Sequence, residues 1–266
     1  MSRRLLASAA LALLAPSTAG CGSSSPPPAA GSNGPATASS PALSGEITVF
    51  AAASLTKAFT DLGKQFEAAH PGTTVTFSFG ASSTLAQQII AAAPADVFAS
   101  ASAANMKQVT DAGDAADPRT FANNTAEIAV WPASAGKVSG IADLAKPGVK
   151  VALCQPQVPC GALAQTVLGK AQVTVTPVTQ GLDVKSTLAY VTSGEADAAI
   201  VYVTDVKAAG ATVTGIEIPA ASNATTAYPI ATVRTSKNLP VATAFQDLVL
   251  SSAGQAALSG AGFTTP

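Results

Sequence analysis

Two serines in this chain stand where a short apolar strand runs into a helix, a position suited to binding an anion. Ser54 follows Ala51-Ala52-Ala53, and Ser82 follows Gly80-Ala81. The first N–H groups of a helix have no intrahelical partner and carry the positive end of the helix dipole, and small residues before them let a ligand come close. Both serines are therefore candidate anion ligands. The alternative is that each is an ordinary N-cap, which contributes about 1 kcal/mol of helix stability.

Neutral donors would have to hold such an anion, because these turns contain no basic residue before Lys57. Several N–H and O–H groups that converge in a dry cleft can replace the hydration shell of an anion. An enzyme remains the alternative, since Ser54-Leu55-Thr56-Lys57 matches the Ser-x-x-Lys motif of penicillin-recognising enzymes. That motif needs a Lys-Thr-Gly or Lys-Ser-Gly partner, and neither is present. His70 is the single histidine, which argues against a metal site.

The N-terminus has the features of an export signal. Arg3 and Arg4 precede an apolar run over residues 5–15, which is too short to span a membrane. Small residues before Cys21 resemble the lipobox of bacterial lipoproteins, although Thr18 stands where that pattern usually has leucine. We predict a signal peptide over residues 1–20, acylation of Cys21 and anchoring to the outer face of the cell membrane. The alternative is cleavage elsewhere, with Cys21 left as a free thiol.

The segment that follows the signal is predicted to be a tether, and the rest of the chain to be globular. Residues 21–44 are almost wholly Ser, Pro, Ala, Gly and Thr, a composition that cannot offset chain entropy by burial. Of the 14 Lys and Arg residues, loss of residues 1–20 removes two, which leaves 12 against 15 Asp and Glu, a net charge of −3. This charge argues against a nucleic-acid partner.

Strands alternate with helices along the ordered chain, which predicts an α/β fold with a mostly parallel sheet covered on both faces. The pattern restarts near residue 125, so we predict domain I over residues 45–124 and 227–266, and domain II over residues 125–226. In domain II the expected strands cover residues 127–132, 149–154, 173–176 and 196–202, and the expected helices cover residues 141–144, 161–170 and 184–193. Parallel sheets bind ligands beyond the carboxyl ends of their strands, where both serine turns lie.

Four stretches carry a resemblance to a known family. They are Val49-Phe50-Ala51-Ala52-Ala53-Ser54-Leu55-Thr56, Ser78-Phe79-Gly80-Ala81-Ser82-Ser83-Thr84-Leu85-Ala86, Ala93-Pro94-Ala95-Asp96-Val97-Phe98-Ala99-Ser100-Ala101 and Ile200-Val201-Tyr202. Together they resemble the periplasmic molybdate-binding proteins of molybdate ABC transporters, the ModA family. The resemblance implies a two-domain substrate-binding fold of type II that closes on molybdate or tungstate and delivers it to a membrane permease. It implies no cofactor and a monomer, and a sulfate-type oxyanion is the alternative ligand.

The resemblance also implies a set of ligand residues. Ser54 and Ser82 match the serines of the first domain, and Tyr202 matches a tyrosine that ends the Ile-Val-Tyr strand. Cys160 takes the place of an alanine that donates a backbone N–H, and Val184 matches the next such donor. The sequence departs from the family at Gly80-Ala81, where Ala-Ser is common, and at Cys160 itself. Neither change removes a backbone donor.

Two further expectations come from the residues themselves. Asp183 would repel an anion, so we expect it to cap the helix that begins at Val184 from outside the pocket. Cys154 and Cys160 are the cysteines that remain after Cys21, and the residues between them are turn-rich. In an oxidising compartment these features predict a disulfide. The alternative is a pair of buried free thiols.

Overall fold

The computed structural model describes residues 43–266, which lie in one compact unit. The predicted signal peptide, the acylation of Cys21 and nearly all of the predicted tether fall outside the described residues. No helix in the described part of the chain is long and apolar enough to cross a lipid bilayer.

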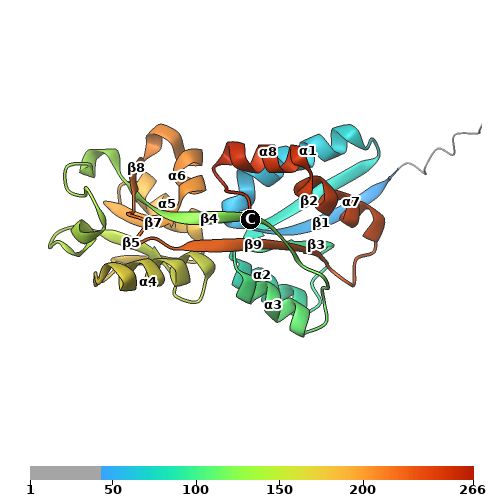
Figure 1. Cartoon of the computed structure of the whole chain (residues 1–266), viewed down its shortest axis with the longest axis horizontal. Helices are drawn as coiled ribbons and strands as arrows, with labels where there is room; N and C mark the ends of the chain where they lie inside the picture. Colours follow the sequence, from blue (N-terminus) through green and yellow to red (C-terminus); the bar gives the residue numbers. More distant parts are fainter. Residues whose placement is uncertain (1–42) are drawn as a thin grey trace, which may run out of the picture. The chain divides into compact units, whose positions relative to one another are not determined.

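The first group of elements is a sheet with helices on both faces (Figure 1). It comprises β1 (Gly45–Ala52), β2 (Thr73–Gly80), β3 (Val97–Ala99), α1 (Thr56–Ala69), α2 (Ser82–Ile90), α3 (Ala103–Asp111), α7 (Leu239–Leu250) and α8 (Ser252–Ala261). The side chains of β1 alternate between two buried faces. Ile47 and Val49 pack among residues of α1, α7 and α8, whereas Phe50 packs among residues of α2 and α3. Because helices cover both faces, the carboxyl ends of the strands remain for a ligand.

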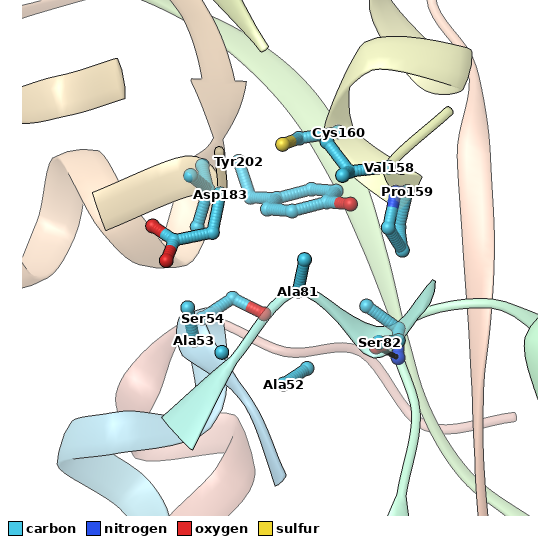
Figure 2. A pocket seen from close by; sticks show the side chains of 13 residues that line it. Ala52, Ala53, Ser54, Ala81, Ser82, Val158, Pro159, Cys160, Asp183 and Tyr202 are labelled. Carbon is cyan, nitrogen blue, oxygen red and sulfur yellow. Dashed lines mark hydrogen bonds between the residues drawn. The ribbon is translucent and has the colours of Figure 1, made fainter. Parts of the chain in front are cut away.

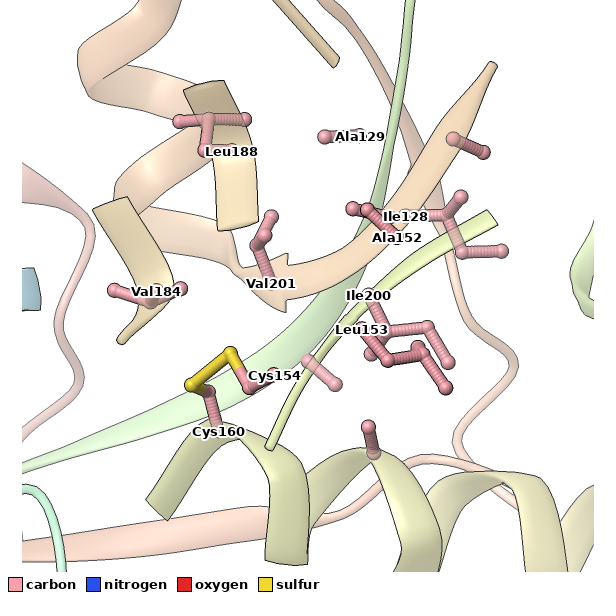
Figure 3. Close-up of a cluster of buried hydrophobic side chains, with 14 of the residues drawn as sticks. Ile128, Ala129, Ala152, Leu153, Cys154, Cys160, Val184, Leu188, Ile200 and Val201 are labelled. Carbon is pink, nitrogen blue, oxygen red and sulfur yellow. A yellow bond between two sulfur atoms is a disulfide. The ribbon is translucent and has the colours of Figure 1, made fainter. Parts of the chain in front are cut away.

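The second group is built in the same way around its own apolar core (Figure 3). It comprises β5 (Val151–Cys154), β6 (Thr179–Gly181), β7 (Ala198–Tyr202), β8 (Thr214–Glu217), α4 (Pro159–Ala171), α5 (Val184–Thr192) and α6 (Val203–Ala209), with 3-10 turns η2 (Pro132–Ser134), η3 (Ile141–Ala145) and η4 (Gly210–Thr212). Ile128, Leu153 and Ile200 lie in this core. Val184 and Cys160, at the starts of two helices, also belong to it.

Two long strands join the groups: β4 (Arg119–Val130) and β9 (Thr225–Thr232) pair antiparallel over residues 119–125 and 225–230. The strand order is β2-β1-β3-β9-β4-β7-β5-β6, with β8 paired to β4. The first core draws on residues 47–122 and 228–263, and the second on residues 126–224 together with Ala53 and Ala81. This division fits the predicted boundaries after residues 124 and 226, which stay a prediction.

The predicted α/β architecture is confirmed, but the pairing is mixed rather than mostly parallel. β1 is parallel to β2 and β3, and β5 is parallel to β6 and β7. Every antiparallel pair involves β4 or β9, the strands that carry the chain between the groups in opposite directions. The connecting strands therefore account for the difference.

The strand predicted over residues 173–176 is wrong. Val173 and Val175 pack partly buried against the second core, as their alternation suggested, but their backbone joins no ladder. Pro177 has no N–H to donate, and pairing with β5 begins at the next residue, where the N–H of Val178 donates to Val151 O at 2.9 Å. The short helix predicted over residues 141–144 is the 3-10 turn η3.

Candidate functional site

A small pocket lies where the ends of β1 and β2 face the starts of α4 and α5 (Figure 2). Its lining consists of Ala52, Ala53, Ser54, Gly80, Ala81, Ser82, Ala101, Val158, Pro159, Cys160, Asp183, Val184 and Tyr202. The space inside it is about 10 Å³, on the scale of one water molecule. All five predicted ligand residues are in this lining, and their role as ligands stays a prediction.

Ser54 does not cap its helix. The chain leaves β1 through a 3-10 turn, η1 (Ala53–Leu55), and α1 then begins at Thr56 with no side-chain cap. The Oγ of Ser54 lies 2.8 Å from the hydroxyl of Tyr228 instead. Lys57 bonds Asp61, with 2.9 Å between Nζ and Oδ2, so the Ser-x-x-Lys pair of the enzyme alternative is not assembled. The N-cap alternative for Ser54 is wrong.

Ser82 is the first residue of α2, whose N-cap position is Ala81, and it is almost fully buried. Its Oγ accepts a hydrogen bond from the N–H of Ala101 at 2.9 Å. The N-cap alternative is therefore wrong for Ser82 as well. Since the oxygen accepts from Ala101, the hydroxyl hydrogen of Ser82 is available to a ligand in the pocket.

Two helix starts face the serines from the second group. Pro159 occupies the first turn of α4, where a missing N–H costs nothing, and Cys160 follows it. The N–H groups of Ser82, Cys160 and Val184 make no backbone hydrogen bond among the described residues beyond those inside the helices. These N–H groups lie in the first turn of each helix, at the end that borders the pocket. The same end of each helix is the positive end of its dipole.

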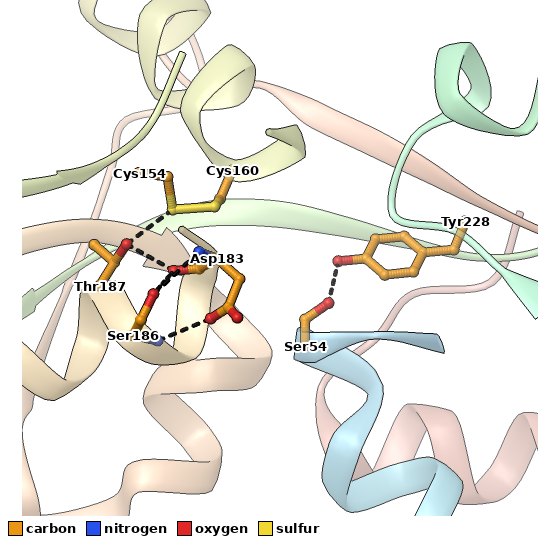
Figure 4. Close-up of a disulfide and its surroundings, with 7 residues drawn as sticks. All are labelled: Ser54, Cys154, Cys160, Asp183, Ser186, Thr187 and Tyr228. Atoms are coloured by element: carbon orange, nitrogen blue, oxygen red, sulfur yellow. Dashed lines mark hydrogen bonds between the residues drawn. A yellow bond between two sulfur atoms is a disulfide. The ribbon is translucent and has the colours of Figure 1, made fainter. Parts of the chain in front are cut away.

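The predicted disulfide between Cys154 and Cys160 is confirmed, with the two Cα atoms 5.7 Å apart (Figure 4). It ties the end of β5 to the start of α4. Thr187 of α5 places its Oγ1 3.1 Å from the Sγ of Cys154. The covalent bond and this contact connect the two helix starts that supply Cys160 and Val184 to the pocket.

Tyr202 ends β7 and is buried, and its ring meets that of Tyr228 edge to face at 6.1 Å between centroids. Its hydroxyl makes no hydrogen bond within the described residues, although it lies in the lining. Burial raises the pKa of Tyr202 well above its ordinary value, so the phenol stays neutral and keeps its hydrogen. A buried hydroxyl without a partner is costly, and a ligand acceptor in the pocket would satisfy it.

The lining contains no lysine or arginine, and Asp183 is its single carboxylate. Asp183 caps α5, as predicted: its Oδ1 accepts from the N–H of Ser186 at 2.8 Å, and the N–H of Asp183 donates to the Oγ of Ser186 at 3.0 Å. Asp183 is a residue of the lining, but its carboxylate points away from Ser54 and Tyr202 (Figure 2). The carboxylate is occupied by its capping bond to Ser186, so its position relative to a bound anion stays a prediction.

Comparison with known proteins shows the family. A model of the bacterial extracellular solute-binding proteins matches residues 47–264. The molybdate-binding protein ModA of Mycobacterium tuberculosis is 39% identical over 241 residues, which cover 90% of this chain and 92% of that protein. The chain belongs to the ModA family of bacterial extracellular solute-binding proteins.

Solved structures show that this ModA-family chain has a widely shared fold. The periplasmic molybdate-binding protein of Azotobacter vinelandii has a TM-score of 0.74 at 22% identity, covering 83% of this chain and 99% of that chain. The sulfate-binding protein SubI of M. tuberculosis has a TM-score of 0.71 at 19% identity, covering 83% and 86%. The two scores are close, so the fold does not choose between the oxyanions for which these proteins are named.

Sequence reasoning missed the polar residues behind the pocket of this ModA-family chain. Tyr228 and Asn124 are buried, and Asn124 Nδ2 lies 3.3 Å from the Tyr228 hydroxyl. Asp205 is fully buried with the Nζ of Lys185 2.8 Å away. Burial raises the pKa of Asp205, and the Lys185 ammonium opposes that rise. No local pattern pointed to Tyr228, because its partner Ser54 is 174 residues away in the sequence.

Proposed function

We propose that this protein binds molybdate or tungstate as an intact oxyanion and delivers it to an ABC transporter permease. The observation that carries the proposal is the convergence of serine hydroxyls and helix N-termini from both groups of elements on one small cavity without a basic side chain. The name and identity of the M. tuberculosis relative support the choice of anion. Ser54, Ser82, Cys160, Val184 and Tyr202 are the proposed ligands.

The chemistry of this donor set suits a fully ionised tetrahedral anion. Hydroxyls of Ser54, Ser82 and Tyr202 and backbone N–H groups of Cys160 and Val184 donate, and a dianion such as molybdate only accepts. Hydrogen bonds to a charged group are about twice as strong as those between neutral groups. Because the donors are fixed by helix starts and by a disulfide, little ordering is needed when the anion binds.

The proposed ligands come from both groups of elements, an arrangement that suits a protein whose two domains close on the anion. The ligands divide between the two groups of elements, which β4 and β9 connect. We propose that the two domains close on the anion by bending at these strands, since hinges absorb such changes at element ends. The permease would then distinguish the closed form from the open one, and the protein itself carries out no chemical step on the anion.

The location of the protein is proposed from its N-terminal sequence. Removal of residues 1–20, acylation of Cys21 and a tether over residues 21–44 would hold a monomeric binding domain at the outer face of the cell membrane. This arrangement keeps the domain near the permease. Mass spectrometry of membrane-extracted protein tests it, because the proposal predicts an N-terminal peptide that begins at a lipid-modified Cys21.

Isothermal titration calorimetry with molybdate, tungstate, sulfate and phosphate tests the proposed ligand. We expect tight binding of molybdate and tungstate and weaker binding of sulfate. All three are dianions with four acceptor oxygens, so size distinguishes them rather than donor chemistry. Sulfate binding more tightly than molybdate would assign the protein to sulfate uptake, and binding of none of these anions would refute the proposed function.

A further inference from the structure

We propose that Asn124, a residue outside the pocket lining, determines the direction in which the Ser54 hydroxyl donates, and that it acts through Tyr228. The inference rests on the proposed function, because it assigns a positioning residue to the same anion site. Asn124 lies on β4 and Tyr228 on β9, and both are 1% exposed or less. Figure 4 shows the last step, the hydrogen bond between Tyr228 and Ser54.

The orientation of the Asn124 side-chain amide follows from its neighbours. The N–H of Thr125 lies 3.1 Å from Oδ1 and can only donate, so the amide oxygen must stand on that side. The two hydrogens of Nδ2 then have two acceptors, Thr204 Oγ1 at 2.8 Å and the Tyr228 hydroxyl oxygen at 3.3 Å. Asn124 is therefore a donor to Tyr228.

Tyr228 has a single hydroxyl hydrogen, and the atom that accepts it determines whether Ser54 is an acceptor or a donor toward Tyr228. The groups among the described residues within hydrogen-bond distance of this hydroxyl are Asn124 and Ser54. Against the rise that burial causes, the nearby Tyr202 hydroxyl lowers the pKa of Tyr228, as a donor does, and so offers no competing acceptor. Since Asn124 donates, the Tyr228 hydrogen finds an acceptor at Ser54 Oγ, 2.8 Å away. A hydrogen directed elsewhere would be buried without a partner, at an energetic cost. Burial also raises the pKa of Tyr228, which keeps that hydrogen in place.

The direction of the hydrogen bond between Tyr228 and Ser54 determines what Ser54 presents to the pocket. Its oxygen accepts from Tyr228, so its own hydrogen points away from Tyr228 and is free for an acceptor in the pocket that Ser54 lines. In the opposite arrangement Ser54 would donate to Tyr228 and present lone pairs to the anion. The relay from Asn124 through Tyr228 thus selects a donor for the anion before it binds, which is preorganisation by a residue that never touches it.

Asn124→Asp tests the relay, because it keeps the shape and replaces the donor by an acceptor. Tyr228 would then donate to the carboxylate and Ser54 would donate to Tyr228. We expect the affinity for molybdate to fall by more than about a hundredfold, since an inverted hydroxyl is worse than an absent one. Tyr228→Phe leaves the Ser54 hydroxyl free to rotate, and we expect a loss of less than about tenfold.

The added charge of Asn124→Asp needs its own control, which Ser54→Ala provides. In a Ser54→Ala background no hydroxyl remains to invert, so the effect of Asn124→Asp should shrink by at least about tenfold. An equal loss with and without the Ser54 hydroxyl would mean that charge or local distortion acts directly, and the relay would be wrong. Thermal unfolding of each variant without ligand confirms that it is folded.

Neutron diffraction of deuterium-exchanged, ligand-free crystals tests the relay independently of any ligand. We expect the deuterium between Tyr228 and Ser54 to lie on the tyrosine oxygen. Deuterium on Ser54 Oγ, directed toward Tyr228, would overturn the relay even if the wild-type protein binds molybdate tightly. Failure of the wild-type protein to bind any oxyanion would refute the proposed function, while the neutron result would still decide the relay.

Discussion

Ser82→Ala is expected to lower both the stability of the free protein and its affinity for the anion, each for a different reason. In the free protein the change removes the acceptor of the Ala101 N–H, a bond of 2.9 Å in a buried setting. Leaving such a donor unpaired costs about 1 to 3 kcal/mol of unfolding free energy. In the complex the change also removes a hydrogen bond to a charged ligand, worth about 1.5 to 3 kcal/mol, so the affinity should fall by at least about tenfold.

Calorimetric titration with molybdate measures the second effect, and urea unfolding without ligand measures the first. Ser83→Ala is the matched control, because Ser83 stands in the same helical turn but outside the lining. We expect its affinity to stay within about twofold of the wild type, as for most surface substitutions. If Ser82→Ala lowered stability but left the affinity unchanged, Ser82 would be a structural residue and the serine ligands would be wrong.

Three further predictions concern the disulfide, acid stability and ligand protonation. Reduction of the Cys154–Cys160 disulfide should lower the free energy of unfolding by no more than about 3 kcal/mol, because the closed loop is short. It should also weaken anion binding, because the Cys160 N–H is held less firmly. Urea unfolding and calorimetry, each with and without reductant, measure the two effects. Burial raises the pKa of Asp197, but hydrogen bonds from Lys137, Ser134 and the N–H of Lys150 outweigh it and hold the pKa at about 2. The resulting stabilisation, on the order of 2 kcal/mol, is complete above about pH 5 and is lost as the pH falls through about 2. In urea unfolding, Asp197→Asn should therefore destabilise the protein at pH 7 and make a much smaller difference near pH 2. Phosphate should bind more weakly than molybdate by about one to two decades, because donors leave its P–OH unpaired; tight phosphate binding, abolished by Asp183→Asn, would instead show that this carboxylate accepts the phosphate proton.

The pocket was predictable from sequence because its parts are local. A strand that runs through small residues into a helix start is visible around Ser82. The turn-rich segment between Cys154 and Cys160, the cysteines that remain after Cys21, predicts their disulfide. The assignment of Cys160, Val184 and Tyr202 came from the family resemblance, and the structure brings them together with the serines. Their convergence depends on how β4 and β9 connect the two groups of strands, which local patterns do not encode.

The exact use of each serine hydroxyl was not predictable for the same reason. An N-cap is a local interaction, so it is the natural expectation for Ser54 and Ser82. Their observed partners are Tyr228 and the N–H of Ala101, which lie 174 and 19 residues away. Residues 173–176 show the converse error: alternating Val and Thr have the period of a strand, but Pro177 prevents pairing and the valines are packed without a ladder.

A crystal structure of the protein soaked with molybdate, phased on the anomalous scattering of molybdenum, tests the central claim most directly. We expect one strong molybdenum peak in the pocket, with oxygens at hydrogen-bond distance from Ser54 Oγ, Ser82 Oγ, the Tyr202 hydroxyl and the N–H groups of Cys160 and Val184. Molybdenum bound elsewhere, or held in the pocket by a lysine or arginine that moves into it, would contradict recognition of the anion by neutral donors.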